Sequence, residues 1–194
     1  MKILQGKMAQ IFEGLKGKRQ FLGNPLNRND RVGMLNRSWG HVFTNLLKGA
    51  YYEFGVYKGD TLLESWNSYL GFKKWAESQV TSPEAWRREV IKEYIHYQHH
   101  FYGFDTFEGM PANKEENKTF LQGSFLASLG EVEKKSLDKK KKVRLFKGMF
   151  SDVSEEVMRD LQPAAIVNID GDLYFSASRA LTLSDSFSLS HSGH

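Results

Sequence analysis

Four short apolar segments alternate with helix-like stretches, and this alternation constrains the fold more than any other feature of the sequence. The segments are residues 49–56, 101–105, 143–146 and 164–169. Strands that alternate with helices indicate βαβ units, which place the strands in a parallel sheet. Crossovers in such a sheet are right-handed, and ligands bind beyond the carboxyl ends of its strands. We therefore predict an α/β fold with its functional site at that edge.

The stretches between the segments predict the helices. A helix is expected over 60–78 with a break near Gly71, and further helices over 125–137 and 154–161. The last strand, 164–169, is nearly all apolar, which predicts burial on both of its faces. Another helix precedes the second strand and carries an apolar stripe that we interpret as core packing, formed by Trp86, Val90, Ile91, Tyr94 and Ile95.

Bulk composition narrows the class of protein. The chain has 194 residues, 40% hydrophobic and 26% charged, as expected for one soluble domain. Apolar runs stay well short of the roughly 18 residues that cross a bilayer, and the N-terminus lacks a signal-peptide pattern. These features predict a cytoplasmic protein without a membrane partner. The absence of cysteine excludes disulfides, thiolate metal sites and cysteine nucleophiles.

Much of the net charge of +4 is local. Lys134, Lys135 and 139–142 surround Asp138, which predicts a solvated helix end or loop. No aromatic residues interleave these lysines as a base-stacking surface requires, so nucleic acid remains a minor alternative. His96, His99 and His100 are interpreted in the same way, as a solvated helix end rather than a metal site.

Glycine and acidic residues follow the first two strands. Gly55 and Gly59 lie in a turn that opens a helix, where backbone can approach a ligand and N–H groups are unpaired. Their spacing is not G-x-G-x-x-G, so a pyrophosphate site is poorly supported. Asp105 ends the second strand, where a nucleotide ribose meets a carboxylate in doubly wound folds. A simple connection and a turn cap are the alternatives for these two segments.

A pair of carboxylates follows the fourth strand. Asp170 and Asp172 are two residues apart, so both can reach the carboxyl edge of the sheet. One carboxylate can hold a divalent cation while the other accepts a proton. An ordinary Asp-Gly turn would explain the same residues without any chemistry.

Taken together, the strand-end segments resemble one family. EFGVYKGDT (53–61), YGFDTFEGMP (102–111), FKGMF (146–150) and IVNIDGDLY (166–174) occur in the family's order. They are similar to class I S-adenosylmethionine-dependent methyltransferases, in particular the sugar O-methyltransferases of antibiotic biosynthesis of the macrocin and novobiocin type. The resemblance implies a Rossmann-like parallel sheet with strand order 3-2-1-4. It covers about residues 49–181.

The resemblance also implies the cofactor and its contacts. S-adenosylmethionine would lie across the strand ends. Successive loops would contact its methionine end, its ribose, its adenosine and its adenine. The methionine end would lie on Glu53, Gly55 and Gly59, the ribose on Asp105, the adenosine beside Thr106 and Phe107, and the adenine near Gly148 and Phe150.

A metal and a base are implied in the same way. The family's metal is Mg²⁺; Asp170 matches a metal ligand, and Asp172 matches the proposed general base. The implied partner is a small-molecule hydroxyl acceptor, a sugar or glycoside. Bound Mg²⁺ would lower the pKa of that hydroxyl while Asp172 takes its proton.

The last residues depart from the family. A complete sheet of this class has seven strands, whereas four are found here, and 184–194 turns serine-rich. We expect a C-terminally truncated chain with a helical cap over 1–48, an incomplete cofactor-binding domain over 49–183 and an irregular tail over 184–194. Truncation would leave Asp170 short of partners for Mg²⁺ and expose an edge of the fourth strand, which invites homo-oligomer formation.

Two other functions compete with methyl transfer. A catalytically inactive cofactor-binding fragment, or an interaction module, would retain Glu53 and Asp105 but lack a complete metal site. A nicotinamide dehydrogenase would share the fold class, but the missing G-x-G-x-x-G argues against it.

Overall fold

A parallel sheet forms the centre of the molecule. The computed structural model describes residues 31–81, 83–110, 121–136, 142–170, 178, 181 and 182. In these residues four strands pair in the order β3-β2-β1-β4, all parallel, which confirms the predicted fold class and strand order. The strands are β1 (Ala50–Phe54), β2 (Phe101–Asp105), β3 (Val143–Lys147) and β4 (Ala164–Ile169).

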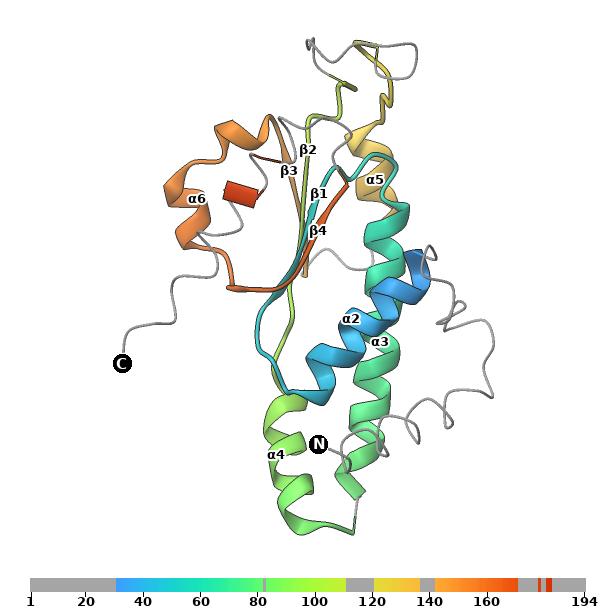
Figure 1. The fold of residues 1–194 in the computed structure, drawn as a ribbon, viewed down its shortest axis with the longest axis vertical. Coiled ribbons are helices and arrows are strands. Elements are labelled where there is room, and N and C mark those ends of the chain that lie inside the picture. The colour runs from blue at the N-terminus through green and yellow to red at the C-terminus, as the bar shows by residue number, and fades with distance from the viewer. Residues whose placement is uncertain are drawn as a thin grey trace.

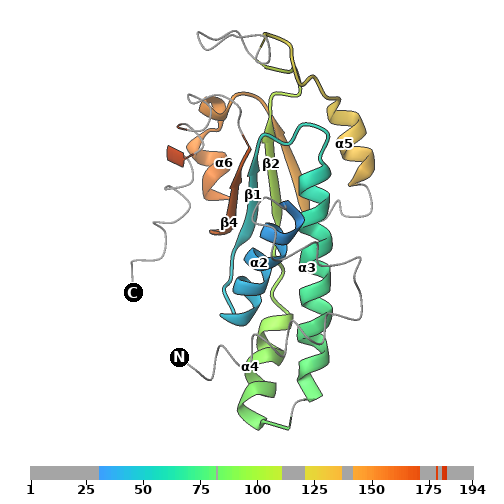
Figure 2. The same cartoon turned by 45° about the vertical axis from the view of Figure 1, so that its right-hand side comes forward.

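Helices lie on both faces of this sheet (Figure 1). One face carries α2 and α3, with α5 near the carboxyl ends of the strands, and the other face carries α6 (Figure 2). The short helix α4 lies beyond the amino ends of the strands. The helices are α2 (Arg31–Thr44), α3 (Asp60–Ser78), α4 (Ala85–Ile95), α5 (Leu129–Lys135) and α6 (Glu155–Arg159), with single 3-10 turns η1 (Gln79–Thr81) and η3 (Phe150–Asp152).

Alternate residues of the central strands divide the core into two clusters. Tyr51 and Phe101 face α2 and α3, where Trp39 is fully buried among aromatic rings. Tyr52 and Phe104 face the other way and pack with residues around α6. The alternation follows from the two-residue period of a strand, and both faces are apolar because helices cover both.

The predicted helices need three corrections. Helix α3 runs unbroken through Gly71, so the expected break there is wrong. Helix α5 begins only at Leu129, because Phe125 has a left-handed φ of 58° and the N-cap Ser128 is extended. Helix α6 is shorter than predicted and spans Glu155–Arg159.

Burial also differs from expectation in two places. The stripe on α4 is only half buried: Ile91 and Tyr94 lie in the core, whereas Trp86 is 65% exposed and Val90 41% exposed. Strand β4 was expected to be buried on both faces, but its Val167 is 37% exposed. Within the described residues β4 pairs with β1 alone and forms an edge of the sheet, which explains its partial exposure.

Candidate functional site

The turn after β1 has the backbone shape that its glycines allow. Gly55 (φ 92°) and Gly59 (φ 76°) are both left-handed, and so is Tyr57 (φ 49°). Gly59 is the N-cap of α3, and a Cβ atom there would lie 2.8 Å from Cγ1 of Val132 in α5. Glycine is therefore required at 59 for conformation and for close packing of α5 against the turn.

Asp105 joins three of the predicted site segments. Its Oδ2 accepts a 2.8 Å hydrogen bond from the Tyr57 N–H, and its Oδ1 accepts one of 2.8 Å from the Phe107 N–H. Its main-chain oxygen accepts a 3.0 Å bond from the Gly148 N–H. Each carboxylate oxygen has a second lone pair, so Asp105 can still accept hydroxyl donors from a ligand. The predicted residues of β1, β2 and β3 thus meet at one edge.

The loop after β2 is held by its own short-range bonds. Thr106 Oγ1 donates to the Gly109 carbonyl at 3.0 Å and accepts from the Glu108 N–H at 3.3 Å. Phe107 is left-handed (φ 53°) and its side chain is buried. Gly109 lies against residues 123–124, because the Met110 N–H donates to the Ser124 carbonyl at 2.7 Å. The loop is thereby fixed at the strand ends.

Alanine is expected to be tolerated far less well at Gly109 than at Gly123. Both glycines have φ 79°, but a Cβ atom at Gly109 would lie 2.8 Å from two main-chain carbonyl oxygens, whereas one at Gly123 meets no atom within 4 Å. Gly123→Ala carries only the left-handed backbone penalty of about 1 kcal/mol. Gly109→Ala adds a clash with backbone, for a total near ~3 kcal/mol. Urea unfolding of both variants checks this, and equal losses would contradict it.

Glu53 is a buried carboxyl at the end of β1. Its side chain is fully buried, and its Oε2 accepts a 2.6 Å hydrogen bond from the Tyr51 hydroxyl. Its Oε1 has no hydrogen-bond partner among the described residues. Burial raises the pKa of the Glu53 carboxyl from 4.5 to about 8, and nearby Asp170 adds to the rise, against the lowering effects of Tyr51, Arg31 and Asn168. The Glu53 carboxyl can therefore accept a hydrogen bond from a ligand.

A polar chain through the core supports Glu53. Trp39 Nε1 donates to Ser65 Oγ at 2.9 Å, which joins α2 to α3. Burial raises the pKa of the Tyr51 hydroxyl well above its usual range, with the Glu53 charge as the next cause, so Tyr51 stays a hydrogen-bond donor to Glu53. In β4, Asn168 is the register partner of Glu53.

Asp170 lies at the end of β4 next to an arginine. Its N–H donates to the Phe54 carbonyl at 2.9 Å, and its Oδ2 lies 3.7 Å from Nη2 of Arg31. Arg31 Nη1 also donates to Thr61 Oγ1 at 2.9 Å. Among the described residues, no three His, Cys, Asp or Glu side chains come together as metal ligands. These residues therefore do not fit a magnesium site by themselves, and the other predicted carboxylate, Asp172, lies outside the described residues.

The segment after β3 completes the edge. Gly148 (φ 147°) follows the strand and carries the N–H that bonds to Asp105. Phe150, in η3, packs its ring edge-on against Phe54 at 5.3 Å between centroids. Phe150 thus belongs to the α6 side of the core and is partly buried there.

Two residues near the site were not predicted as site residues. Arg31 starts α2, in a basic polar stretch with no motif around it. Lys135 ends α5; its Nζ lies 2.8 Å from the Lys58 carbonyl and 2.9 Å from Asp60 Oδ1. Lysines 134 and 135 do form a helix end as expected, but Lys135 binds the glycine turn. Only tertiary structure brings either residue to the strand ends.

The histidine prediction is partly wrong. His96 is exposed, but His99 is buried, with Nδ1 at 2.6 Å from the Gly49 carbonyl and Nε2 at 3.1 Å from the Tyr94 hydroxyl. Burial lowers the pKa of His99 from 6.5 to about 4. His99 is a neutral core residue at the amino end of the sheet, remote from the strand ends that carry Glu53 and Asp105.

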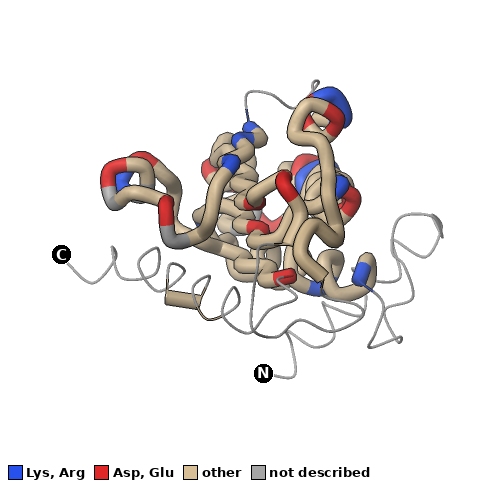
Figure 3. Tube along the Cα trace, turned by 90° about the horizontal axis from the view of Figure 1, so that it is seen from above, with Lys and Arg blue, Asp and Glu red and all other residues tan. Residues whose placement is uncertain are grey.

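Charge at the strand ends is mixed in sign. Viewed from this end, acidic and basic positions intermingle over the described part of the chain, with no continuous basic field (Figure 3). A phosphate backbone is bound by clustered positive charge, which the described part of this face does not show. None of the helices that the structure describes is long and apolar enough to cross a membrane.

The parallel sheet, with glycine and acidic residues gathered at its carboxyl edge, defines a Rossmann-like methyltransferase fold. A solved structure described as the O-methyltransferase NovP matches it with a TM-score of 0.59 and 20% sequence identity, over 81% of this chain and 60% of that chain. Residues 86–188 match the family model of macrocin-O-methyltransferase (TylF). The chain therefore belongs to the macrocin-O-methyltransferase (TylF) family, which confirms the resemblance seen in the sequence. No curated protein matches the chain.

Proposed function

We propose that this chain carries the cofactor-binding part of an S-adenosylmethionine-dependent O-methyltransferase that acts on a hydroxyl of a sugar or related small molecule. The observation that carries the proposal is Glu53: a fully buried carboxyl whose Oε1 has no partner among the described residues, at the edge where the glycine turn and Asp105 meet. Membership of the TylF family supports this reaction class.

The cofactor would lie across the ends of β1, β2 and β3. Glu53, with Gly55 and Gly59, would take the methionine end, where the amino group would donate a hydrogen bond to Oε1, which has no partner in the described part of the chain. A cation beside Glu53 lowers the pKa of its carboxyl and so favours the charged form. Asp105 would accept the ribose hydroxyls, and the adenosine would lie along Thr106, Phe107, Gly148 and Phe150.

The bound cofactor supplies a methyl group already activated by its sulfonium centre. The chain then has to align the acceptor hydroxyl for in-line attack and exclude water from the site. We assign the acceptor's proton to Asp172, which follows the proposed metal ligand Asp170 by two residues. In the described residues Asp170 lies beside Arg31 and has too few neighbouring donors for Mg²⁺, so no step is assigned to a metal.

The wider organisation is proposed on the same basis. Residues 49–183 would form the cofactor-binding unit, and residues 1–48 would contribute a cap on the substrate side. Helix α2 supports this, because it packs against α3 and its first residue, Arg31, contacts Thr61 and Asp170. We further propose a cytoplasmic location and self-association through the edge of β4.

Isothermal titration of the chain with S-adenosylmethionine at pH 8 tests the proposed function. We expect saturable binding, and we expect Glu53→Gln to weaken it by about tenfold, because a hydrogen bond to a charged group is replaced by one to a neutral amide. Glu108→Gln, an exposed carboxylate paired with Lys147, serves as the matched control and should leave binding unchanged.

The outcomes separate the competing functions. NADH tests for a nicotinamide enzyme, which is the alternative function within the same fold class. We expect the chain not to bind NADH. Cofactor binding together with methyl transfer to a sugar hydroxyl supports the full proposal, whereas binding without transfer supports a non-catalytic cofactor-binding module. Absence of S-adenosylmethionine binding would overturn both.

A further inference from the structure

The glycine turn is held from two sides. On the sheet side, Asp105 accepts the Tyr57 N–H, as described above. On the helix side, α5 packs Val132 against Gly59 and directs Lys135 at the same turn. Tyr57 and Gly59 flank Lys58 and are both left-handed, a conformation that the turn keeps only while its surroundings hold it.

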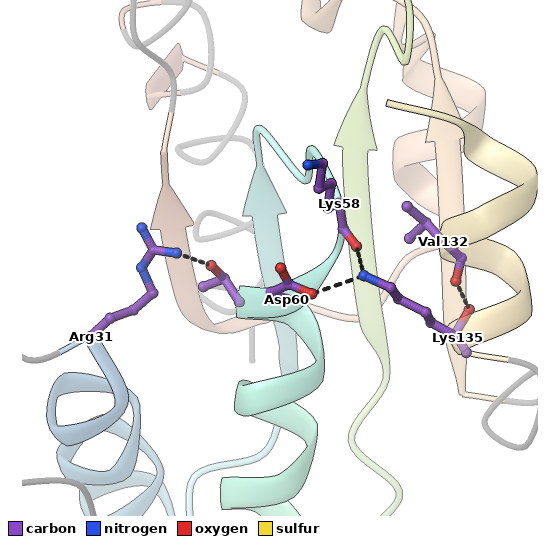
Figure 4. Close-up of polar contacts among 7 residues, drawn as sticks. Arg31, Lys58, Asp60, Val132 and Lys135 are labelled. Atoms are coloured by element: carbon purple, nitrogen blue, oxygen red, sulfur yellow. Dashed lines mark hydrogen bonds and ion pairs between the residues drawn. The ribbon is translucent and has the colours of Figure 1, made fainter. Parts of the chain in front are cut away.

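Lys135 makes two contacts at the turn. Its Nζ donates to the main-chain carbonyl of Lys58 at 2.8 Å and to Asp60 Oδ1 at 2.9 Å. Figure 4 shows its side chain reaching from α5 to both acceptors, with Arg31 on the other side of the start of α3. The contacts join positions 77 and 75 residues apart in the sequence, so they fix the turn to a separate element of the fold.

These contacts affect the shape and charge of the turn more than the overall stability of the fold. The Lys135 side chain is 41% exposed and that of Asp60 is 71% exposed, and exposed ion pairs add little to the stability of a fold. Asp60 is the first residue of α3, where its negative charge would repel an anionic group approaching the turn. Lys135 offsets that charge and also fixes the Lys58 carbonyl.

We infer that Lys135 is a positioning residue for the methionine end of the cofactor. The inference rests on the proposed function: the turn 55–59 must meet that end of S-adenosylmethionine. Lys135 does not touch the cofactor. It holds the Lys58 carbonyl and neutralises Asp60, so that the turn meets the amino acid part of the ligand in one geometry.

Cofactor binding by Lys135→Ala tests this inference. We expect the dissociation constant for S-adenosylmethionine to rise by about tenfold, because binding must then order a turn that Lys135 no longer holds. Affinity for 5′-methylthioadenosine, which lacks the amino acid part, should stay within about twofold, as should the affinities of Lys134→Ala for both ligands. Lys134 is the matched control because it is the exposed neighbour of Lys135 on the same helix.

Further variants separate positioning from loss of structure. Lys135→Arg keeps donors for both acceptors and should recover most of the affinity, whereas Lys135→Gln should not. The thermal midpoint of Lys135→Ala should shift by no more than about 2 °C. Equal losses for both ligands, or unchanged S-adenosylmethionine affinity, would overturn the inference while wild-type binding stands. Failure of the wild type to bind S-adenosylmethionine would instead overturn the proposed function.

Discussion

Replacing Trp39 with alanine is expected to lower the free energy of unfolding by about 4 kcal/mol, the range for removing a fully buried aromatic side chain. Trp39 is 0% exposed and packs its ring against Phe101 at 5.4 Å and Tyr69 at 5.2 Å between centroids. Truncation leaves a cavity between α2, α3 and the sheet, because the surrounding rings are fixed to three separate elements and cannot close it. Ser65 Oγ also loses the Nε1–H that it accepts.

Trp86 provides the matched control, because it is the same residue type on the exposed side of α4. With 65% of its surface exposed, Trp86→Ala should change the free energy of unfolding by no more than about 0.5 kcal/mol. Trp39→Phe keeps an aromatic ring in the core and loses the Nε1–H, so it should fall between the two. Urea unfolding followed by circular dichroism ranks the variants. Similar losses for Trp39→Ala and Trp86→Ala would contradict the assigned core.

The two tryptophans show what sequence patterning can and cannot predict. Trp39 lies in a basic, polar stretch, but Leu35, Trp39, Val42 and Phe43 recur there at helical spacing, and the Trp39 ring is at the centre of the core. Trp86 belongs to a regular apolar stripe, yet its side chain is exposed because α4 lies beyond the sheet rather than against its face. The hydrophobic period of a sequence predicts which face of a helix is apolar. Whether that face is buried depends on where tertiary structure places the helix.

The sheet was predictable for a physical reason. Each strand is a short apolar run that ends at a turn, and β2 was predicted with the bounds that the structure gives, Phe101–Asp105. The helix break predicted near Gly71 is absent, because a single glycine inside a long helix costs only about 1 kcal/mol, which the packing of α3 offsets. Strand ends that share one edge also follow from parallel topology, so the meeting of the β1 turn with Asp105 was expected.

The supporting residues of the site were not predictable. Arg31 and Lys135 reach the glycine turn and Asp170 from helices whose docking no local pattern specifies. Neither lies in a motif, and exposed basic residues are common on helix ends. The burial of His99 was missed for the same reason: it lies between α4 and β2, and only the packing of Tyr94 and Gly49 around it shows that its ring belongs to the core.

Opposite pH dependences are expected from the buried carboxyl of Glu53 and the buried imidazole of His99. For Glu53 the pKa is raised from 4.5 to about 8 on folding, so the folded state binds more protons than the unfolded state between these values. Its contribution to stability is full below pH 4.5 and is lost as pH rises through 8. For His99 the pKa is lowered from 6.5 to about 4, so its contribution is full above pH 6.5 and is lost as pH falls toward 4.

Between pH 4.5 and 6.5 the two groups change the stability of the wild type with pH in opposite directions, so their effects nearly cancel. Single substitutions separate the two effects. From pH 5 to pH 8 the stability of wild type relative to Glu53→Gln should fall by about 3 kcal/mol, as the buried carboxyl loses its proton. Over the same range the stability of wild type relative to His99→Gln should rise by about 2 kcal/mol, as the imidazole ring becomes neutral in the unfolded state too. Urea unfolding at half-unit pH intervals gives both difference curves, in which all other titrating groups cancel.

The control for these curves is Glu156→Gln, which removes an exposed carboxylate on α6 and should leave the pH dependences of Glu53 and His99 in place. The Glu53 curve also bears on cofactor binding. Saturating S-adenosylmethionine places a cation beside the carboxyl in the proposed complex, which lowers the pKa of Glu53 and should flatten the fall between pH 6.5 and 8. A fall that persists unchanged with ligand bound would mean that the methionine end does not lie at Glu53. A flat curve without ligand would mean that Glu53 is ionised and solvated in the folded protein, against its complete burial.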